Sequence, residues 1–278
     1  MSIPVLLTTA GREGWEAITT DPARSVIATD FDGVLAPLVA DPSRSRPVDG
    51  ALDALARLSR TVRQVAIVTG RPALVATELA GVSGHPGLER LVVLGHYGLE
   101  RWEASTGAVT SDPVPEGVAV ARERLPEVLR EAGQPDAFIE DKGSSVAVHT
   151  RRLRDPEAAL HALRVPLSEL AEEVGLRLEP GNLVLELRPP GIDKGVAVRR
   201  LLEETGARAV LYAGDDLGDL AAFRAIDELR HDGLYGVLLA TRSSGATELV
   251  NAADIVVDDP AGVVTVFTAL ADAISARG

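Results

Sequence analysis

The chain has 278 residues, of which 46% are hydrophobic and only 3% aromatic, so its core must be built mainly from aliphatic side chains. Acidic residues outnumber basic ones by 41 to 28, which argues against a nucleic-acid-binding surface or attraction to an anionic membrane. The absence of cysteine excludes disulfides, a thiol nucleophile and a zinc–thiolate site. No basic region precedes the short N-terminal apolar run, and no run is long enough to span a membrane, so we expect a cytoplasmic protein.

Residues 1–24 form a lead-in, after which Val26, Ile27 and Ala28 indicate a buried strand. The strand is followed directly by Asp30, Phe31, Asp32 and Gly33. If the chain stayed extended, the two carboxylates would share a face, where they would repel each other unless a cation lay between them or one were protonated. Hard oxygen ligands of this kind suit Mg2+. A strand that ends in an ordinary acidic turn explains the same four residues equally well.

Strands and helices alternate through the next seventy residues. Leucine spacing predicts a helix over 48–58, QVAIV predicts a strand over 64–68 that ends at Thr69-Gly70-Arg71, and Pro72 opens a helix that reaches residue 79. LVVL over 91–94 predicts a third strand, which leads into GHYGLE. This order is typical of a doubly wound, Rossmann-like parallel sheet, in which ligands bind at the carboxyl ends of the strands.

The pattern changes after residue 105. Helices are expected over 116–132 and 155–174, where Pro126 and Pro166 are possible kinks or breaks. Antiparallel hairpins are expected from strands at 137–140 with 144–149, and at 176–179 with 183–187. We therefore predict an inserted α+β domain over 106–187, with the α/β core formed by residues 1–105 and 188–278.

The core pattern resumes with a helix that starts at Lys194. A strand over 209–213 ends at Gly214-Asp215-Asp216, and Asp219 lies just beyond it. A helix over 217–226, a strand over 236–240 and a closing helix over 261–274 complete the prediction.

Four weak signals thus follow one another in order: D-x-D-G, Thr-Gly-Arg, an isolated lysine at a helix start, and GDD with a further aspartate. Together they resemble the haloacid dehalogenase superfamily of phosphohydrolases. That resemblance implies that Asp30 is the nucleophile, Asp32 the general acid/base, and that Thr69 and Lys194 hold the phosphoryl group. It implies a Mg2+ site formed by the following aspartates: Asp30, Asp32, Asp215, Asp216 and Asp219.

The chemistry of a phosphate monoester calls for these groups in any case. A carboxylate cannot approach a phosphate dianion unless cations compensate the charge, and Mg2+ and a lysine would do so. A nucleophilic aspartate would form an aspartyl-phosphate and divide the hydrolysis into two displacements. A second carboxylate would protonate the leaving alkoxide and then take a proton from water.

Several longer stretches resemble the trehalose-6-phosphate phosphatases more closely. They are DFDGVLAPL, VTGRP, LGHYGLE, FIEDKGSSVAVHTR, LVLELRP, GIDKG and GDDLGDLAAF. The resemblance makes the inserted domain a substrate-recognising cap, with His149 near the sugar and the site between core and cap. It implies that the sugar phosphate is contacted by Arg71, His96, Glu140, Lys142, Arg151 and Glu186. Val34 and Gly218 stand where that family usually has threonine.

Gly218 and the GHYGLE loop, which is shifted somewhat from the family's usual pattern, keep another sugar substrate open, and two non-enzymatic classes are further alternatives. The chain could hydrolyse another sugar phosphate, such as a glycosylglycerate phosphate. It could be a sugar-phosphate sensor without turnover, although a sensor has no need of Asp32. A phosphoacceptor signalling module is a third class, but it would not need a sugar-sized cap.

Overall fold

The computed structural model describes residues 4–277, and the chain divides into two compact units. The first, called the core unit below, consists of the residues up to Ser111 and those from Asp193 onward. The second, called the cap unit, is Asp112–Ile192. The predicted division at residue 105 differs from this one because a strand over Val109–Ser111 pairs within the sheet of the core unit.

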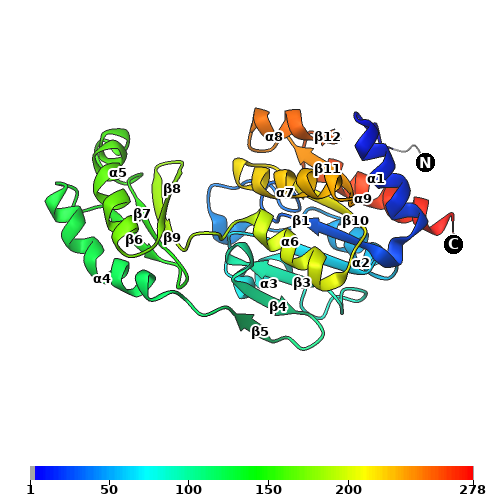
Figure 1. The fold of residues 1–278 in the computed structure, drawn as a ribbon, viewed down its shortest axis with the longest axis horizontal. Coiled ribbons are helices and arrows are strands. Elements are labelled where there is room, and N and C mark those ends of the chain that lie inside the picture. The colour runs from blue at the N-terminus through cyan, green and yellow to red at the C-terminus, as the bar shows by residue number, and fades with distance from the viewer. Residues whose placement is uncertain (1–3, 278) are drawn as a thin grey trace. The chain divides into compact units, whose positions relative to one another are not determined.

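The core unit is organised around an eight-stranded sheet with the order β12-β11-β10-β1-β2-β3-β4-β5 (Figure 1). Neighbouring strands from β12 to β3 are parallel, whereas β4 and β5 are antiparallel additions at one edge. The strands are β1 (Ser25–Thr29), β2 (Gln64–Val68), β3 (Val92–Gly95), β4 (Glu100–Glu103), β5 (Val109–Ser111), β10 (Ala209–Gly214), β11 (Tyr235–Thr241) and β12 (Ile255–Val257).

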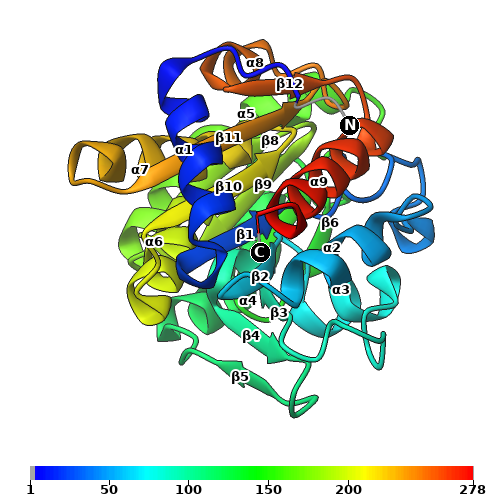
Figure 2. The same cartoon turned by 90° about the vertical axis from the view of Figure 1, so that its right-hand side faces the viewer.

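Helices cover both faces of this sheet, because alternate residues of its buried strands are apolar on either side. Ile27 of β1 packs in one cluster, and its neighbours Val26 and Ala28 pack in the other. Figure 2 shows α9, α2 and α3 along one side of the sheet and α6 and α7 along the other. The core helices are α1 (Thr9–Thr20), α2 (Ala51–Ser59), α3 (Ala73–Ala80), α6 (Lys194–Thr205), α7 (Leu220–His231), α8 (Thr247–Ala252) and α9 (Pro260–Ser275).

The predicted doubly wound α/β core is confirmed, and the lead-in over residues 1–24 contains a helix, α1, that was not anticipated from the sequence. Thr8 caps this helix by accepting a hydrogen bond from the backbone N–H of Gly11. Trp15 and Ile18, one turn apart, are 4% and 0% exposed. The prediction also missed β4, β5, α8 and β12, which are short and carry little periodic signal. Short 3-10 helices lie at Pro22–Arg24, Pro42–Arg44, His96–Gly98 and Leu217–Asp219.

The cap unit has a four-stranded antiparallel sheet with the order β6-β7-β9-β8. Helices α4 (Glu116–Glu131) and α5 (Pro156–Glu173) cover one face, and both continue through their internal prolines. Val146, Val148, Leu185 and Leu187 point to that covered face, so the residues between them belong to the other one. The cap strands are β6 (Phe138–Asp141), β7 (Val146–His149), β8 (Arg177–Gly181) and β9 (Val184–Arg188).

Among the described residues, no helix has the length and apolar character needed to cross a membrane.

Candidate active site

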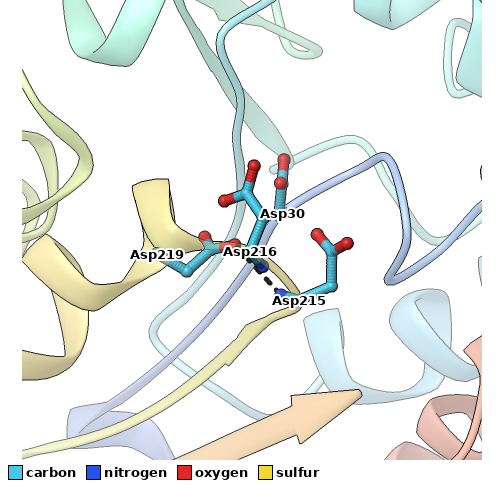
Figure 3. Close-up of side chains that lie close together, drawn as sticks. All are labelled: Asp30, Asp215, Asp216 and Asp219. Carbon is cyan, nitrogen blue, oxygen red and sulfur yellow. Dashed lines mark hydrogen bonds between the residues drawn. The ribbon is translucent and has the colours of Figure 1, made fainter. Parts of the chain in front are cut away.

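Four carboxylates meet where β1 and β10 end (Figure 3). Parallel pairing aligns Thr29 with Ala213, and the backbone N–H of Asp30 donates to the carbonyl of Ala213 at 2.9 Å. The chain segments that follow the two strands therefore start side by side. One ligand atom from each of the following residues lies within 4.8 Å of the others: Asp30, Asp215, Asp216 and Asp219.

The close approach of the two strand ends requires a glycine in the turn after β1. Gly33 has a φ of 73°, a left-handed conformation that side chains disfavour. A Cβ at this position would lie 2.1 Å from Oδ2 of Asp215. Gly33 therefore permits both the turn and the packing of Asp215 against it.

Lys194 binds two members of the carboxylate cluster, Asp30 and Asp219. The Nζ of Lys194 lies 2.6 Å from Oδ2 of Asp30 and 2.7 Å from Oδ1 of Asp219, and the lysine is 3% exposed. Oδ1 of Asp219 also accepts a hydrogen bond from the Tyr212 hydroxyl at 2.6 Å. Its Oδ2 accepts the backbone N–H groups of Asp215 at 3.0 Å and Asp216 at 3.2 Å. Asp219 thus holds the lysine and the loop after β10 in place.

Burial and mutual repulsion act on the carboxylates of this cluster. Burial, with the nearby Asp219 and Asp216 carboxylates, raises the pKa of Asp30 to about 8 against the opposing effect of Lys194. Burial and the Asp30 carboxylate raise the pKa of Asp215 to about 8. Burial alone would lower the pKa of Lys194, but Asp219 and Asp30 outweigh it and hold that pKa well above its usual value. The lysine is therefore charged while two of its neighbours resist ionisation.

This donor set fits a hard divalent cation. Oxygen ligands from several carboxylates are what Mg2+ and Ca2+ bind, and a cation would relieve the repulsion that raises the pKa of Asp30 and Asp215. All the lone pairs of Asp219 are engaged by the four hydrogen-bond donors described above, which leaves Asp30, Asp215 and Asp216 as the better ligands.

The side chain of Asp32 lies outside this group, and the predicted part of Asp32 in holding a metal stays a prediction. Strand β1 ends at Thr29, so the extended alternation that would place Asp30 and Asp32 on one face does not continue. Instead Arg71 donates two hydrogen bonds to Asp32, from Nε to Oδ2 at 2.6 Å and from Nη2 to Oδ1 at 2.7 Å. The hydroxyl of Ser45 donates to Oδ1 at 2.9 Å.

Thr69 follows β2, the other neighbour of β1, and is 1% exposed. Its Oγ1 accepts the backbone N–H of Arg71 at 3.2 Å, so the hydroxyl keeps its own proton to donate. His96, a predicted substrate contact, is 5% exposed, with Nδ1 3.5 Å from Oε1 of Glu100. Its backbone N–H donates to the carbonyl of Arg71 at 2.9 Å, so this residue helps to hold the loop after β2.

The predicted sugar contacts of the cap unit form two pairs and one outlier. Oε2 of Glu186 accepts from Nζ of Lys142 at 2.9 Å, and Oε1 accepts from the hydroxyl of Ser145 at 2.6 Å. Burial alone would raise the pKa of Glu186, but Lys142 and Ser145 lower it below its usual value. In the second pair, Nε2 of His149 lies 2.8 Å from Oε2 of Glu140, and the remaining residue, Arg151, belongs to neither pair.

Arg151 lies after the far end of β7, where its Nη2 donates to the carbonyl of Asn182 at 3.4 Å. Glu140 and Glu186 are both in register with Ala147 of the strand between them. They therefore share one face of the cap sheet, about 10 Å apart at two interstrand spacings. We call this the polar face, defined by Glu140, Ala147 and Glu186.

Three residues of these networks carry no sequence signal that we recognised: Ser45, Ser145 and Tyr212. Ser45 lies in a polar connection and Tyr212 in an apolar strand, so neither stands out by type or position. Ser145 lies within the cap stretch FIEDKGSSVAVHTR that carried the family resemblance but was not singled out there, and its place near Lys142 at the start of a strand was the one available clue.

Comparison with known proteins identifies the family to which this chain belongs. The family model described as trehalose-phosphatase matches residues 28–254. A trehalose-phosphate phosphatase of Mycobacterium avium is 31% identical over 257 residues, which are 87% of this chain and 61% of that protein. One of Mycobacterium marinum is 31% identical over 269 residues, 92% of this chain and 63% of that protein. The chain thus spans less than two thirds of the length of these relatives.

Solved structures show the same fold. The trehalose-6-phosphate phosphatase of Aspergillus fumigatus superposes with a TM-score of 0.69 at 24% identity, covering 98% of this chain and 99% of that one. A haloacid dehalogenase-like hydrolase of Bacteroides thetaiotaomicron superposes with a TM-score of 0.55 at 17% identity, covering 91% of this chain and 99% of that one. The predicted fold class and family resemblance are both confirmed.

Proposed function

Since this chain belongs to the trehalose-phosphatase family, we propose that it hydrolyses trehalose 6-phosphate to trehalose and phosphate. The observation that carries the proposal is the placement of Lys194 between Asp30 and Asp219, at 2.6 and 2.7 Å, beside further carboxylates at the ends of β1 and β10. A buried lysine next to a buried carboxylate compensates charge where a phosphoryl dianion would meet a carboxylate nucleophile.

Asp30 is the proposed nucleophile. Its carboxylate attacks phosphorus, the bond from phosphorus to the sugar oxygen breaks, and Asp32 gives its proton to the departing oxygen. Water then attacks the phosphorus of the aspartyl-phosphate while Asp32 takes back a proton, which releases phosphate and regenerates Asp30. Lys194 stabilises the negative charge on the transferred group, and the hydroxyl of Thr69 is placed to donate to one of its oxygens.

We propose Mg2+ as the cation, with Asp30, Asp215 and Asp216 as its ligands. When bound, it would neutralise the carboxylates and polarise a phosphoryl oxygen. Asp219 contributes indirectly, because it fixes Lys194 and the backbone of the loop that carries Asp215 and Asp216.

The polar face of the cap sheet is the proposed sugar-recognition surface. Glu186 is oriented by Lys142 and Ser145 and is ionised near neutral pH, so its oxygens can accept from sugar hydroxyls. An analogue that lacks such a hydroxyl would leave a partly buried charge without a partner, which makes this arrangement selective. Glu140 and Arg151 are proposed as further contacts, and His96 and Arg71 as contacts from the core unit.

Phosphate release from a sugar-phosphate panel tests the proposal. The purified chain would be given trehalose 6-phosphate, glucose 6-phosphate, sucrose 6-phosphate and a glycosylglycerate phosphate, each with Mg2+ and with a chelator. We expect a strong preference for trehalose 6-phosphate that the chelator abolishes. Preference for another sugar would keep the chemistry and change the substrate. If the chain binds a sugar phosphate but releases phosphate from none of them, it is a sensor and not an enzyme.

A further inference from the structure

Asp32 is held by a residue that no motif of the sequence contains. We propose that Ser45 is a positioning residue for this acid/base, and that Oδ2 of Asp32 is the oxygen through which its proton passes. The proposal deepens the proposed function, because it rests on Asp32 being the group that protonates the leaving oxygen.

The burial of Ser45 and the loop around it support this role. Ser45 is 0% exposed, although the residues on either side of it are exposed. The loop is fixed before it by Asp41, whose Oδ1 accepts from the backbone N–H of Ser43 at 3.0 Å, and after it by the backbone N–H of Val48, which donates to the carbonyl of Leu35 at 2.9 Å. A buried hydroxyl needs a partner, and the partner of Ser45 is Oδ1 of Asp32.

The hydrogen bonds of Asp32 divide unequally between its two oxygens. Oδ1 accepts from both Ser45 and Arg71, so its two lone pairs are engaged. Among the described residues, Oδ2 accepts a hydrogen bond only from Nε of Arg71, so one lone pair remains for a proton. Without Ser45 the two oxygens become equivalent toward Arg71, and the carboxyl group loses its third point of attachment.

This assignment predicts a dependence on the leaving group. An alkoxide, such as that of a sugar, is a poor leaving group and needs the proton of Asp32 as its bond to phosphorus breaks. 4-Nitrophenolate leaves without a proton. The value of kcat/KM covers the steps up to departure of the leaving group, so only the alkyl substrate reports on the placement of this proton.

The test compares Ser45→Ala, Ser45→Thr and Ser43→Ala with the unaltered chain, all with Mg2+. Ser43 is the matched control, because it lies on the same loop but is exposed and donates its hydroxyl to Asp41. Each protein would be given 4-nitrophenyl phosphate and the sugar phosphate that the unaltered chain hydrolyses best, and thermal unfolding would verify that the variants fold.

For Ser45→Ala we expect kcat/KM on the sugar phosphate to fall about tenfold, as for loss of one hydrogen bond to a charged group. The value on 4-nitrophenyl phosphate should stay within about twofold, Ser45→Thr should restore most of the loss, and Ser43→Ala should change neither. Equal losses on both substrates, or no loss on either, would overturn the proposal. If the preferred sugar is not trehalose the proposed substrate fails while this comparison still stands, and hydrolysis of neither substrate would refute both.

Discussion

The two charged regions of the molecule differ in how their charges are balanced. At the ends of β1 and β10, four carboxylates surround one buried lysine, and the negative charge exceeds the positive. On the polar face of the cap sheet, Glu186 forms an ion pair with Lys142, and Glu140 is hydrogen-bonded to His149. A largely buried cluster with excess negative charge is a place where a cation gains most from binding, and with that cation and Lys194 it could then receive a reacting anion. Carboxylates that each have a hydrogen-bonding partner are instead fixed in orientations that suit recognition.

The largest effect should come from the core cluster. We expect Asp30→Asn to lower turnover by about 10⁴-fold or more, because removal of a nucleophile removes the covalent route itself. The amide is similar in size and relieves the repulsion with Asp219 and Asp216, so the variant should fold. Phosphate release with trehalose 6-phosphate and with 4-nitrophenyl phosphate measures the loss, which should be similar for the two. Turnover close to that of the unaltered chain would refute the nucleophile.

A smaller and selective effect is expected from the cap unit. Glu186→Ala should lower kcat/KM for the sugar phosphate by about 10- to 100-fold, as when a hydrogen bond from a charged group to substrate is lost. It should barely change the turnover of 4-nitrophenyl phosphate, which has no hydroxyls for Glu186 to bind. Glu179→Ala is the matched control, because Glu179 is in register with Glu186 on the adjacent strand but is bound to Arg188 at 3.3 Å.

The outcome for Glu186 would also separate the two regions. If Glu186→Ala lowers both activities equally, the Lys142–Glu186 pair supports the fold or the chemistry and does not recognise the sugar. If Glu179→Ala has the same effect as Glu186→Ala, the general charge of the polar face matters and the Lys142–Glu186–Ser145 arrangement does not.

The sequence predicted which strand ends would carry the chemistry. Asp30, Thr69 and Asp215 follow strands whose apolar runs are plain, and parallel pairing of those strands brings their carboxyl ends together. The side chains that hold Asp32 were harder to predict. Arg71 and Ser45 reach Asp32 from 39 and 13 residues away, and such contacts depend on loop conformations that no periodicity encodes.

His96 illustrates the same limit. Its motif predicts a residue in contact with substrate, but its φ of 47° and that of Tyr97, 59°, form a compact turn in which the imidazole is buried. Positive φ at residues other than glycine depends on the surrounding contacts, so the local sequence does not predict this turn. Its predicted contact with substrate stays a prediction.

The smallest effect concerns the stability of the core cluster. In the folded chain without metal, the pKa values of Asp30 and Asp215 are about 8, against an ordinary value of 3.8. Between these values the folded state retains protons that the unfolded state has released, so the free energy of unfolding should fall as the pH rises from about 4 to 8. A cation binds the ionised carboxylates, so at pH 8 it displaces fewer protons than at pH 6. We therefore expect Mg2+ to raise Tm by a larger amount at pH 8 than at pH 6.

Thermal unfolding in chelator and in Mg2+, with KCl at matched ionic strength as the control, measures this difference. Screening by salt acts on all the surface charges of this acidic chain, so KCl should give only the part of the shift that does not depend on the site. The cap pairs should contribute little, because each carboxylate already has a basic partner. A Mg2+ shift that is equal at both pH values, or that KCl reproduces, would mean that the raised pKa values of the core do not mark a cation site.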